Sequence, residues 1–478
     1  MSRMSPGVLA PPREVLTPDE WRRRGRQRRK QTPRGSHAAW EPPKDRPDPV
    51  AILEEQSRSR VPELVPIRYG RMLVSQFTYF RGAAAPMAWD LAHTPTSGIE
   101  VQACGDAHLL NFGMYAAPDR RMVFDVNDFD ETLPAPFEWD LKRLAASFAV
   151  AARDSEFTEN EGREAARMAV ASYRDEMAKY AGMRFLELWY SRIDINEATR
   201  VLDRLQPDKA VQRRQKDIAK ARRRTSLKAF LKMCDLVDGH YRIRPAHPFI
   251  VRIPESTNPH VHDVLREAVA QYLETVAADR REVLRHFYFG DFARKVVGVG
   301  SVGTEAFVML LLGDRPDEPL FLQLKEAQES VLAPFAGKSE FAHQGQRVVT
   351  GQQLTQATHD PFLGWTSAPG TTVDPDGAFA LAKDYYVRQL RDMKGSMSVS
   401  LMDPDQLRYY GKLCGWTLAR AHARTGRANE IAGYLGSGDR FDRAVADFAV
   451  AYADQNWLDY QRLRQAVSSA RLLATVKE

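Results

Sequence analysis

Apolar residues recur every three or four positions through much of the chain, and this spacing predicts amphipathic helices. The predicted helices cover residues 48–56, 141–154, 154–190, 261–287, 340–356, 404–426 and 426–473. The helix over 404–426 is marked most clearly, because it has Pro at its start and Gly just past its end. Helices are therefore expected to dominate the chain.

Between residues 291 and 330 the period changes to two, which is typical of strands. This segment predicts a strand, a Gly-rich turn, a second strand, an Asp-Arg-Pro turn and a third strand. Two further strands are predicted at 247–256, closed by Pro254, and at 384–392. Residues 367–377 (SAPGTTVDPDG) predict a loop or hinge. Many helices with one small antiparallel sheet predict an α+β fold class.

These patterns divide the chain into four parts. Residues 1–50 are a basic, Pro- and Arg-rich leader, 51–285 a large helix-rich part, 286–395 a small part with the sheet, and 396–478 helices that complete the large part. In the leader, seven of the ten residues 21–30 are Arg or Lys. We expect a solvated segment that is disordered or loosely wrapped, with binding of nucleic acid or acidic lipid as the alternative.

The composition of the 478 residues, 44% hydrophobic and 27% charged, is that of an ordinary globular protein. The formal net charge is +6, and the excess is unevenly placed. Besides the leader, residues 209–232 carry ten Lys or Arg against one acid, Asp217. A solvated helix face accounts for this run more simply than nucleic acid, which stays an alternative.

Three cysteines, Cys104, Cys234 and Cys414, are far apart and odd in number. This favours reduced thiols over a disulfide framework or a zinc cluster. No apolar run reaches the ~18 residues of a membrane span, and the first residues lack the apolar core of a secretory signal. These features predict a cytoplasmic protein with no membrane partner.

Residues that suit a metal ion gather between residues 105 and 140, in a segment that is otherwise apolar. They are Asp106, His108, Asn111, Asp125, Asn127, Asp128, Asp130 and Glu131. Carboxylates and amides beside apolar strands cost desolvation energy unless they bind something. So many hard oxygens favour a hard divalent cation, usually Mg²⁺ with phosphate attached. The alternative is a loop of caps and Asx-turns.

A glycine-rich loop lies further along the chain, where Gly298, Gly300 and Gly303 spell GxGxxG around Ser301. A dinucleotide-binding fold needs a helix directly after the glycines, but the sequel EAFVMLLLG is strand-like. A glycine loop between two strands is typical of the loop that covers ATP phosphates in protein-kinase folds. There the missing Cβ lets backbone N–H groups approach the phosphates. The alternative is a plain glycine hairpin.

Kinase-type folds also place a Lys on the next strand to hold the phosphates. Lys325, at the end of the third predicted strand, stands where that role requires. A Glu on the following helix should orient this Lys, and Glu329 and Glu340 are both candidates. The alternative for Lys325 is an exposed side chain on a hairpin.

Arginines stand among aromatic residues before the acidic segment, at Arg68, Arg71 and Arg81. Two interpretations are open. These side chains are clamps for phosphate or carboxylate groups of a ligand, or they only pair with neighbouring acids.

Kinase catalytic loops place an Asp and an Asn as D-x-x-x-x-N, followed after a short hairpin by a second metal-binding Asp. Asp106 and Asn111 have this spacing, and Asp128 is the best placed second acid. Asp125 and Asp130 compete for that position. Asp106 would orient or deprotonate the acceptor hydroxyl, while Asn111 and Asp128 would bind Mg²⁺.

The segment GDAHLLNFG resembles the HGDLHxGN loop of aminoglycoside phosphotransferase-like kinases, with Cys104 where that loop usually has His. The resemblance implies that Asp140 in PFEWDLKRLA caps this loop, and that His108 either touches the substrate or braces the loop. TLARAHARTG (417–426) resembles the helix that ordinarily precedes the loop. Because it lies near the other end of this chain, the implied fold is a circularly permuted two-lobed kinase.

Across residues 13–473 the motifs RYGRM, FRGAA, GDAHLLNFG, FDVNDFDE, EWDLKRLA, LQLKEA, DYYVRQLRDMKGS and LARAHARTG resemble the bacterial DUF2252 family. This resemblance implies a kinase-like superfamily and no particular substrate. We expect a phosphotransferase that uses ATP and Mg²⁺ on an unknown hydroxyl-bearing acceptor, either a small molecule or a protein. The alternatives are transfer of AMP on the same fold, or a non-catalytic protein that binds nucleotide or nucleic acid.

Overall fold

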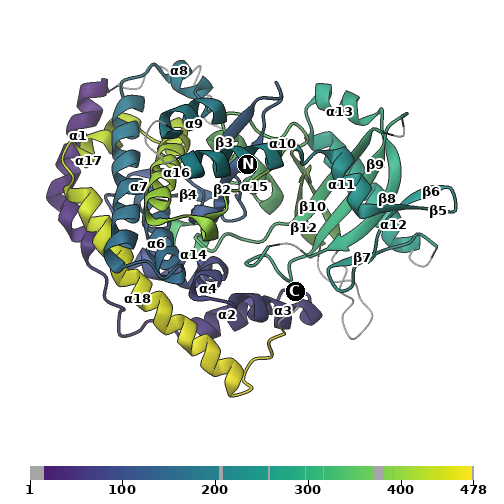
Figure 1. Ribbon diagram of the computed structural model, residues 1–478, viewed down its shortest axis with the longest axis horizontal. Coiled ribbons are helices and arrows are strands. Elements are labelled where there is room, and N and C mark those ends of the chain that lie inside the picture. The colour runs from purple at the N-terminus through teal and green to yellow at the C-terminus, as the bar shows by residue number, and fades with distance from the viewer. Residues whose placement is uncertain are drawn as a thin grey trace.

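The computed structural model describes residues 16–203, 208–256, 259–296, 298–315, 317–369, 382–390 and 392–475. The predicted mixture of helices and small antiparallel sheets is confirmed. Figure 1 shows most helices gathered on one side and a twisted sheet on the other. Most of the predicted hinge at 367–377, and residues 1–15 of the leader, lie outside the described residues.

The helical side is built around four long helices. These are α6 (Phe137–Asp154), α7 (Glu159–Tyr180), α16 (Pro404–Thr425) and α18 (Arg440–Ser468). Helix α6 is buried along nearly its whole length, its polar side chains Asp140 and Arg143 included. Helices α7 and α16 approach closely, because a Cβ on Gly415 would lie 2.0 Å from the Ala169 carbonyl oxygen. The sequence prediction of helices here is confirmed.

Shorter helices and hairpins complete this side. They are α8 (Phe185–Tyr190), α9 (Ile195–Asp203), α10 (Asp208–Arg222), α14 (Ala333–Ala336), α17 (Ala428–Leu435), strand β1 (Glu100–Ala103) paired with β4 (Leu133–Pro136), and β2 (Phe112–Ala116) paired with β3 (Met122–Val126). Most polar residues of the acidic segment lie in the connections between these short strands, whereas Asp125 lies on β3.

Six antiparallel strands form the large sheet, in the order β11-β12-β10-β9-β8-β7. Their bounds are Ile250–Arg252 (β7), Tyr288–Lys295 (β8), Ala306–Leu312 (β9), Pro319–Glu326 (β10), Gly364–Pro369 (β11) and Ala382–Gln389 (β12). The strands predicted at 247–256, 291–330 and 384–392 are therefore confirmed. In this register Lys325 on β10 stands between Ala306 on β9 and Tyr386 on β12.

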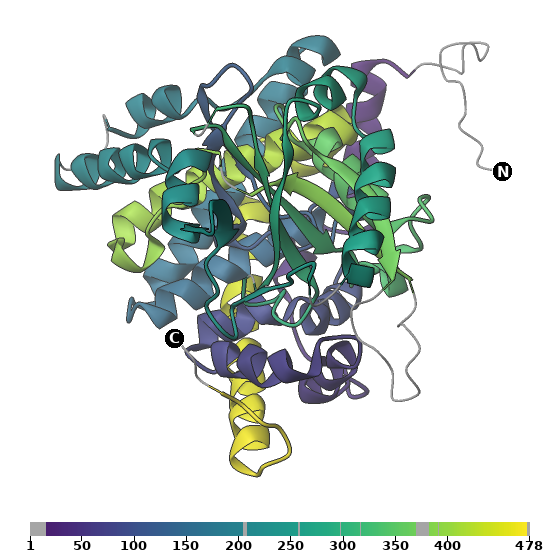
Figure 2. The same ribbon diagram turned by 90° about the vertical axis from the view of Figure 1, so that its right-hand side faces the viewer.

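Helices cover both faces of this sheet, and Figure 2, viewed from the sheet side, shows the helical region behind it. Helices α12 (Pro259–Thr275) and α13 (Ala278–Leu284) pack on one face, α12 through Leu265 and Tyr272 and α13 through Leu284. Helix α11 (Ser226–Met233), followed by the β5–β6 hairpin (Cys234–Val237, His240–Ile243), packs on the other through Phe230. The helices just before residue 286 thus bury their apolar sides on the sheet.

Two predicted helices are divided in the structure. The expected helix at 261–287 breaks between α12 and α13, and the basic run at 209–232 breaks between α10 and α11. Helix α15 (Gln344–Thr355) lies within the predicted 340–356. None of the helices in the described ranges is long and apolar enough to cross a lipid bilayer. Cys104, Cys234 and Cys414 are all free and buried.

The prediction of a loosely wrapped leader is wrong for residues 18–31, which form helix α1 (Pro18–Gln31). A capping box between Thr17 and Glu20 starts the helix. Arg28 donates to a Glu430 carboxylate oxygen at 2.7 Å, and Arg29 donates to the Tyr434 carbonyl at 2.8 Å. The basic side chains are ordered because they satisfy the carbonyls at the C-terminus of α17 and one buried carboxylate.

Candidate functional site

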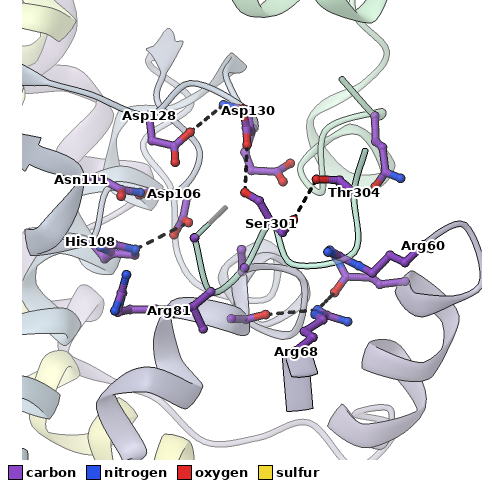
Figure 3. Close-up of a pocket in the computed structure, with 18 of the residues that line it drawn as sticks. Arg60, Arg68, Arg81, Asp106, His108, Asn111, Asp128, Asp130, Ser301 and Thr304 are labelled. Carbon is purple, nitrogen blue, oxygen red and sulfur yellow. Dashed lines mark hydrogen bonds and ion pairs between the residues drawn. The ribbon is translucent and has the colours of Figure 1, made fainter. Parts of the chain in front are cut away.

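A polar cavity of about 120 Å³ lies where the glycine-rich loop meets the acidic segment (Figure 3). Its walls come from four stretches of the sequence. The acidic segment supplies Asp106, His108, Asn111, Asp128, Asp130 and Glu131, and the glycine loop supplies residues 298–301 and 304. The region from α2 to α4 supplies Arg60, Arg68 and Arg81, and the end of β10 with the residues after it supplies Glu326 and Gln328. These helices are α2 (Pro49–Ser57), α3 (Val65–Met72) and α4 (Gln76–Gly82), and α5 (Ala84–Ala92) follows.

Asp140 on α6 holds the backbone of the predicted catalytic loop. Its carboxylate accepts hydrogen bonds from the Cys104 N–H at 2.6 Å and the Gly105 N–H at 2.9 Å. The ring of His422, on α16, lies 3.0 Å from the same carboxylate. Gly105 has φ of +82° and a Cβ there would lie 2.3 Å from the Glu131 carbonyl oxygen, so only glycine fits. The predicted capping role of Asp140 is confirmed.

Asp106 reaches the cavity with one carboxylate oxygen engaged. Arg143 donates through Nε to Oδ1 at 2.5 Å, while Oδ2 lies 3.9 Å from His108 Nε2. The Asn111 side-chain amide donates to the Asp106 carbonyl at 2.7 Å and fixes the turn between them. The side chain of Asp106 is 20% exposed. It therefore presents an oxygen to a ligand in the cavity.

His108 braces the loop and faces the cavity at the same time. Its Nδ1 accepts the Leu110 N–H at 3.2 Å, so it caps the short 3₁₀ turn Leu109–Asn111. Burial, reinforced by the positive charges of Arg81 and Arg143, lowers the pKa of His108 well below its ordinary value. A neutral imidazole with a filled Nδ1 suits a bracing role better than that of a proton donor.

Asn111 and Asp128, the predicted metal ligands, both line the cavity. The Asn111 amide nitrogen is used within the loop, which leaves its oxygen directed elsewhere. Asp128 accepts one long bond, 3.4 Å, from the Asp130 N–H. Burial and the nearby charge of Asp130 raise the pKa of Asp128. A buried carboxylate that accepts only one long hydrogen bond is a good ligand for a cation.

Lys325 points from β10 to the acidic segment and pairs with Asp130. The Tyr386 hydroxyl donates to the other Asp130 oxygen at 2.7 Å, and Ser301 Oγ lies 3.4 Å from the carboxylate. Burial opposes the charge of Lys325, but the carboxylates of Asp128 and Asp130 outweigh it and raise the pKa of Lys325. The Asp130 carboxylate thus joins the glycine-rich loop, through Ser301, to Lys325 on β10.

The expected Glu partner of Lys325 is replaced by Asp130. Helix α15, which follows β10, contains no acidic residue, and neither Glu329 nor Glu340 lies on it. In the helix, Arg347 instead donates to the carbonyls of Asp130 and Thr132 at 2.8 and 2.7 Å. The helix therefore positions the acidic segment through its backbone.

Asp125 lies outside the cavity, so it does not join the other predicted metal ligands. It is 3% exposed on β3, and Arg420 of α16 donates to both of its oxygens at 2.6 and 2.7 Å. Burial still raises the pKa of Asp125, although Arg420 opposes the shift. This pair anchors α16 behind the site. Within the described ranges no preformed cluster of three His, Cys, Asp or Glu side chains suits a metal.

The glycine-rich loop is tied down by the segment before α4, a feature that the sequence did not reveal. Arg60 donates to the Val302 carbonyl at 2.5 Å, Arg71 donates to the Gly298 carbonyl at 2.5 Å, and the Val61 N–H donates to the Gly303 carbonyl at 2.8 Å. We call Arg60, Val61 and Arg71 the N-terminal clamp. Gly298 and Gly303 have φ of +66° and +92°, which explains why both are glycine.

The three arginines flagged in the sequence do not pair with acids. Arg68 donates to neutral partners, which include Gln56 Oε1 at 3.0 Å, and Arg71 donates to the glycine loop. For Arg81, no carboxylate of the described residues lies within 4.0 Å, and its buried Nε has no hydrogen-bond partner. Arg60, which lines the cavity too, was missed because it stands in a polar stretch without any motif.

The basic run at 209–232 is separate from the cavity. In its described part, Arg222 donates to Asn196 Oδ1 at 3.1 Å, and Arg224 donates to the Lys394 carbonyl at 3.2 Å. Asp217 accepts from the Ser398 N–H at 3.4 Å. Several of these side chains thus make ordinary intramolecular contacts on two helices.

Comparison with known proteins adds a family to this geometry. The chain matches no curated protein and no solved structure. Residues 60–466 match the family described as "Uncharacterized protein conserved in bacteria (DUF2252)". The matched range contains Arg60, the acidic segment, the glycine loop, Lys325 and α16. Because it covers most of the chain, this protein belongs to the DUF2252 family.

Proposed function

We propose that this protein is an ATP- and Mg²⁺-dependent phosphotransferase with a two-lobed, circularly permuted kinase-like fold. The observation that carries the proposal is the convergence on one cavity of a glycine-rich loop between two strands and the Asp106–Asn111 loop. Next to that cavity, Lys325 of the following strand pairs with Asp130. Kinases bring these parts together to hold ATP phosphates and an acceptor hydroxyl.

The packing of α16 supports the permutation. In an unpermuted kinase the corresponding helix comes just before the catalytic loop. Here His422 and Arg420 of α16 reach Asp140 and Asp125, at sequence separations of 282 and 295 residues. The helix therefore lies where a kinase needs it, although it comes from the other end of the chain.

The residues around the cavity fit Mg²⁺ held together with phosphate. Asn111 and Asp128 would hold the ion, because both offer oxygens there and the Asp128 carboxylate lacks strong donors. Mg²⁺ prefers one or two protein ligands, with phosphate and water completing its shell. Once bound, it would neutralise charge on the transferred phosphate. Asp130, which is engaged by Lys325 and Tyr386, is the less suitable ligand.

The proposed step joins the acceptor oxygen to the γ-phosphorus of ATP and breaks the bond between that phosphorus and the β–γ bridging oxygen. ADP leaves with the electron pair, and Asp106 Oδ2 takes the proton of the hydroxyl. Arg143 keeps the carboxylate in place through Oδ1. Lys325 would shift from Asp130 to the phosphates, while backbone N–H groups of residues 298–303 cover them.

The proposal predicts that Mg·ATP binding depends on Lys325 and Asp128. Lys325→Met and Asp128→Asn should each weaken binding at least about tenfold, or about 1.4 kcal/mol. Isothermal titration with a non-hydrolysable Mg·ATP analogue measures this. Lys338→Met and Asp314→Asn, at exposed positions, are matched controls that should bind like the wild type. Unchanged affinity in both site variants would contradict the assignment.

A label on ATP separates the possible transfer reactions. With extracts as the acceptor source, label on the γ-phosphate should enter a product, and label on the α-phosphate should not. Asp106→Asn should reduce the transfer about 10²- to 10⁴-fold, the usual contribution of a general base. Incorporation of the α-label would instead indicate transfer of AMP, and binding without either label would indicate a non-catalytic role.

A further inference from the structure

A second cavity, of about 310 Å³, lies between the large sheet and the helices α12 and α13. Helix α12 supplies Val269 and Leu273, which are one helical turn apart and so share a helix face. Strand β9 supplies Met309 and Leu311, which alternate along the strand and point to the same side of the sheet. Leu322 of β10 stands directly opposite Met309 and adds to this apolar wall. We call this cavity the α12 pocket.

The α12 pocket is separate from the cavity at the acidic segment. Leu322 and Leu324 of β10 pack into the apolar cluster under α12, so Lys325, the next residue along the strand, points to the opposite face of the sheet. On that face Lys325 pairs with Asp130. The two cavities have no lining residue in common. A molecule in the α12 pocket would therefore not occupy the proposed site for phosphate and Mg²⁺.

An apolar cavity of this size is uncommon in a folded protein. Side chains in protein interiors leave few voids larger than a water molecule, and an unfilled cavity lowers stability in proportion to its volume. The pocket also reaches the surface, because Phe289 lines it and is 43% exposed. A molecule from solution thus has a way in, and filling the cavity would stabilise the folded chain.

The polar side chains inside the pocket already have partners. The Tyr272 hydroxyl donates to the Phe362 carbonyl at 2.8 Å, and His262 Nε2 donates to the Ile253 carbonyl at 2.7 Å. Neither ring therefore offers a free donor to a ligand. A charged or strongly polar ligand would lose its hydration here and gain no hydrogen bond from these side chains in return.

The rim of the pocket also disfavours an acid. Arg266 lines the pocket and pairs with Glu255 and, at 2.6 Å, with Asp263. Two carboxylates around one guanidinium leave this part of the rim with an excess of negative charge. The carboxylate of a fatty acid would be repelled there.

We propose that the α12 pocket binds an uncharged apolar small molecule. Sites for small molecules begin at roughly 300 Å³ and have mainly apolar walls, and the α12 pocket meets both conditions. An apolar cavity of about 150 Å³ accommodates benzene, so the ligand is an alkyl chain or a fused ring about twice that size. The inference does not rest on the proposed function.

Calorimetric titration of the full chain with 1-decanol and with 2-naphthol, both below their solubility limits, tests the pocket. We expect one site for at least one of these uncharged probes, and the better probe shows whether a chain or a ring fits. Decanoate, which carries a similar chain on a charged group, should bind at least about tenfold more weakly than 1-decanol. The bound probe should also raise the thermal midpoint, because it stabilises only the folded state.

Leu273→Trp should fill the pocket. The affinity for the probe should fall at least about tenfold, while the thermal midpoint stays near that of the wild type or rises, because filling a cavity does not unfold a protein. Val269→Phe adds less volume and provides the same test if Leu273→Trp does not fold. Leu186→Trp, at a position on α8 that is 64% exposed, is the matched control and should bind like the wild type.

Three results would overturn the proposal. They are no binding of either uncharged probe, binding of decanoate as tight as that of 1-decanol, and full affinity in folded Leu273→Trp or Val269→Phe. Self-association that Leu273→Trp abolishes, without any binding of the probes, would assign this face to a second copy of the chain. Asp128→Asn separates the inference from the proposed function, since it should bind the probe like the wild type and yet lose the Mg·ATP analogue.

Discussion

Individual side chains in the cavity hold charge states that depend on their neighbours. Glu131 accepts the Val331 N–H at 2.7 Å and lines the cavity beside Asp130. Burial raises the pKa of Glu131 to about 7, and the hydrogen bond from Val331 opposes the shift. The folded protein therefore binds a proton that the unfolded chain releases between its ordinary pKa of 4.5 and about pH 7.

This difference predicts a pH-dependent contribution to stability. The contribution of Glu131 should be greatest below pH 4.5 and fall as the pH rises to about 7, by up to about 3 kcal/mol. Urea unfolding of wild type and Glu131→Gln between pH 5 and 8 measures it, since the amide keeps an acceptor for Val331 but does not titrate. The difference in unfolding free energy between the two proteins should change over this window. A constant difference would show that Glu131 ionises normally.

At the residue scale, the sequence predicted the positions that depend on local spacing along the chain. The D-x-x-x-x-N spacing placed Asp106 and Asn111 on one cavity, and the strand period placed Lys325 beside it. The partner of Lys325 could not be predicted, because Asp130 is contributed by a segment 195 residues away. The burial of Asp125 with Arg420 was hidden for the same reason.

At the scale of helices and strands, periodicity predicted most elements, but composition misled for α1. A segment with seven basic residues in ten is not expected to pack against a neighbour. Its Gly25 nevertheless lies so close to α17 that a Cβ would be 2.0 Å from the Glu430 carbonyl oxygen. The signal was a glycine in an otherwise charged helix, which marks a close approach of two backbones. Basic residues on either side then reach the end of α17.

Gly25→Ala should therefore destabilise the protein although alanine favours helices. The added methyl group forces α1 away from α17, and overpacking of this kind costs about 1–3 kcal/mol. Gly438→Ala, where a Cβ has nothing within 4 Å, is the control and should change stability by less than about 0.5 kcal/mol. Urea unfolding of both variants compares them. Equal stabilities would mean that α1 is not docked as described.

At the scale of the whole molecule, the predicted catalytic loop is held in place by distant parts of the chain. Asp140 joins the Cys104 and Gly105 amides to His422 of α16. Each motif could be recognised in the sequence because it kept its own local pattern. The packing of helices α2 to α4 on the glycine loop could not, since no local pattern encodes a contact between segments more than 200 residues apart.

Asp140→Ala should lower the stability of the whole chain by about 2–6 kcal/mol, because two buried N–H groups lose their acceptor at roughly 1–3 kcal/mol each. The measurement is the free energy of unfolding in urea, together with hydrogen exchange at Cys104 and Gly105, which should become faster. Asp454→Asn, which removes an exposed ion pair with Arg153, should cost less than about 1 kcal/mol. A loss in Asp140→Ala no larger than in this control would argue against the capping role.

The N-terminal clamp has a consequence for the speed of ligand entry. Arg60, Val61 and Arg71 hold both ends of the glycine-rich loop, over a cavity smaller than a nucleotide requires. Under the proposed function, a nucleotide enters only after these bonds open, so the observed association rate should level off at high concentration and reach the opening rate of the clamp. The same bonds would slow departure, which gives a bound nucleotide a long residence time even where its affinity is modest.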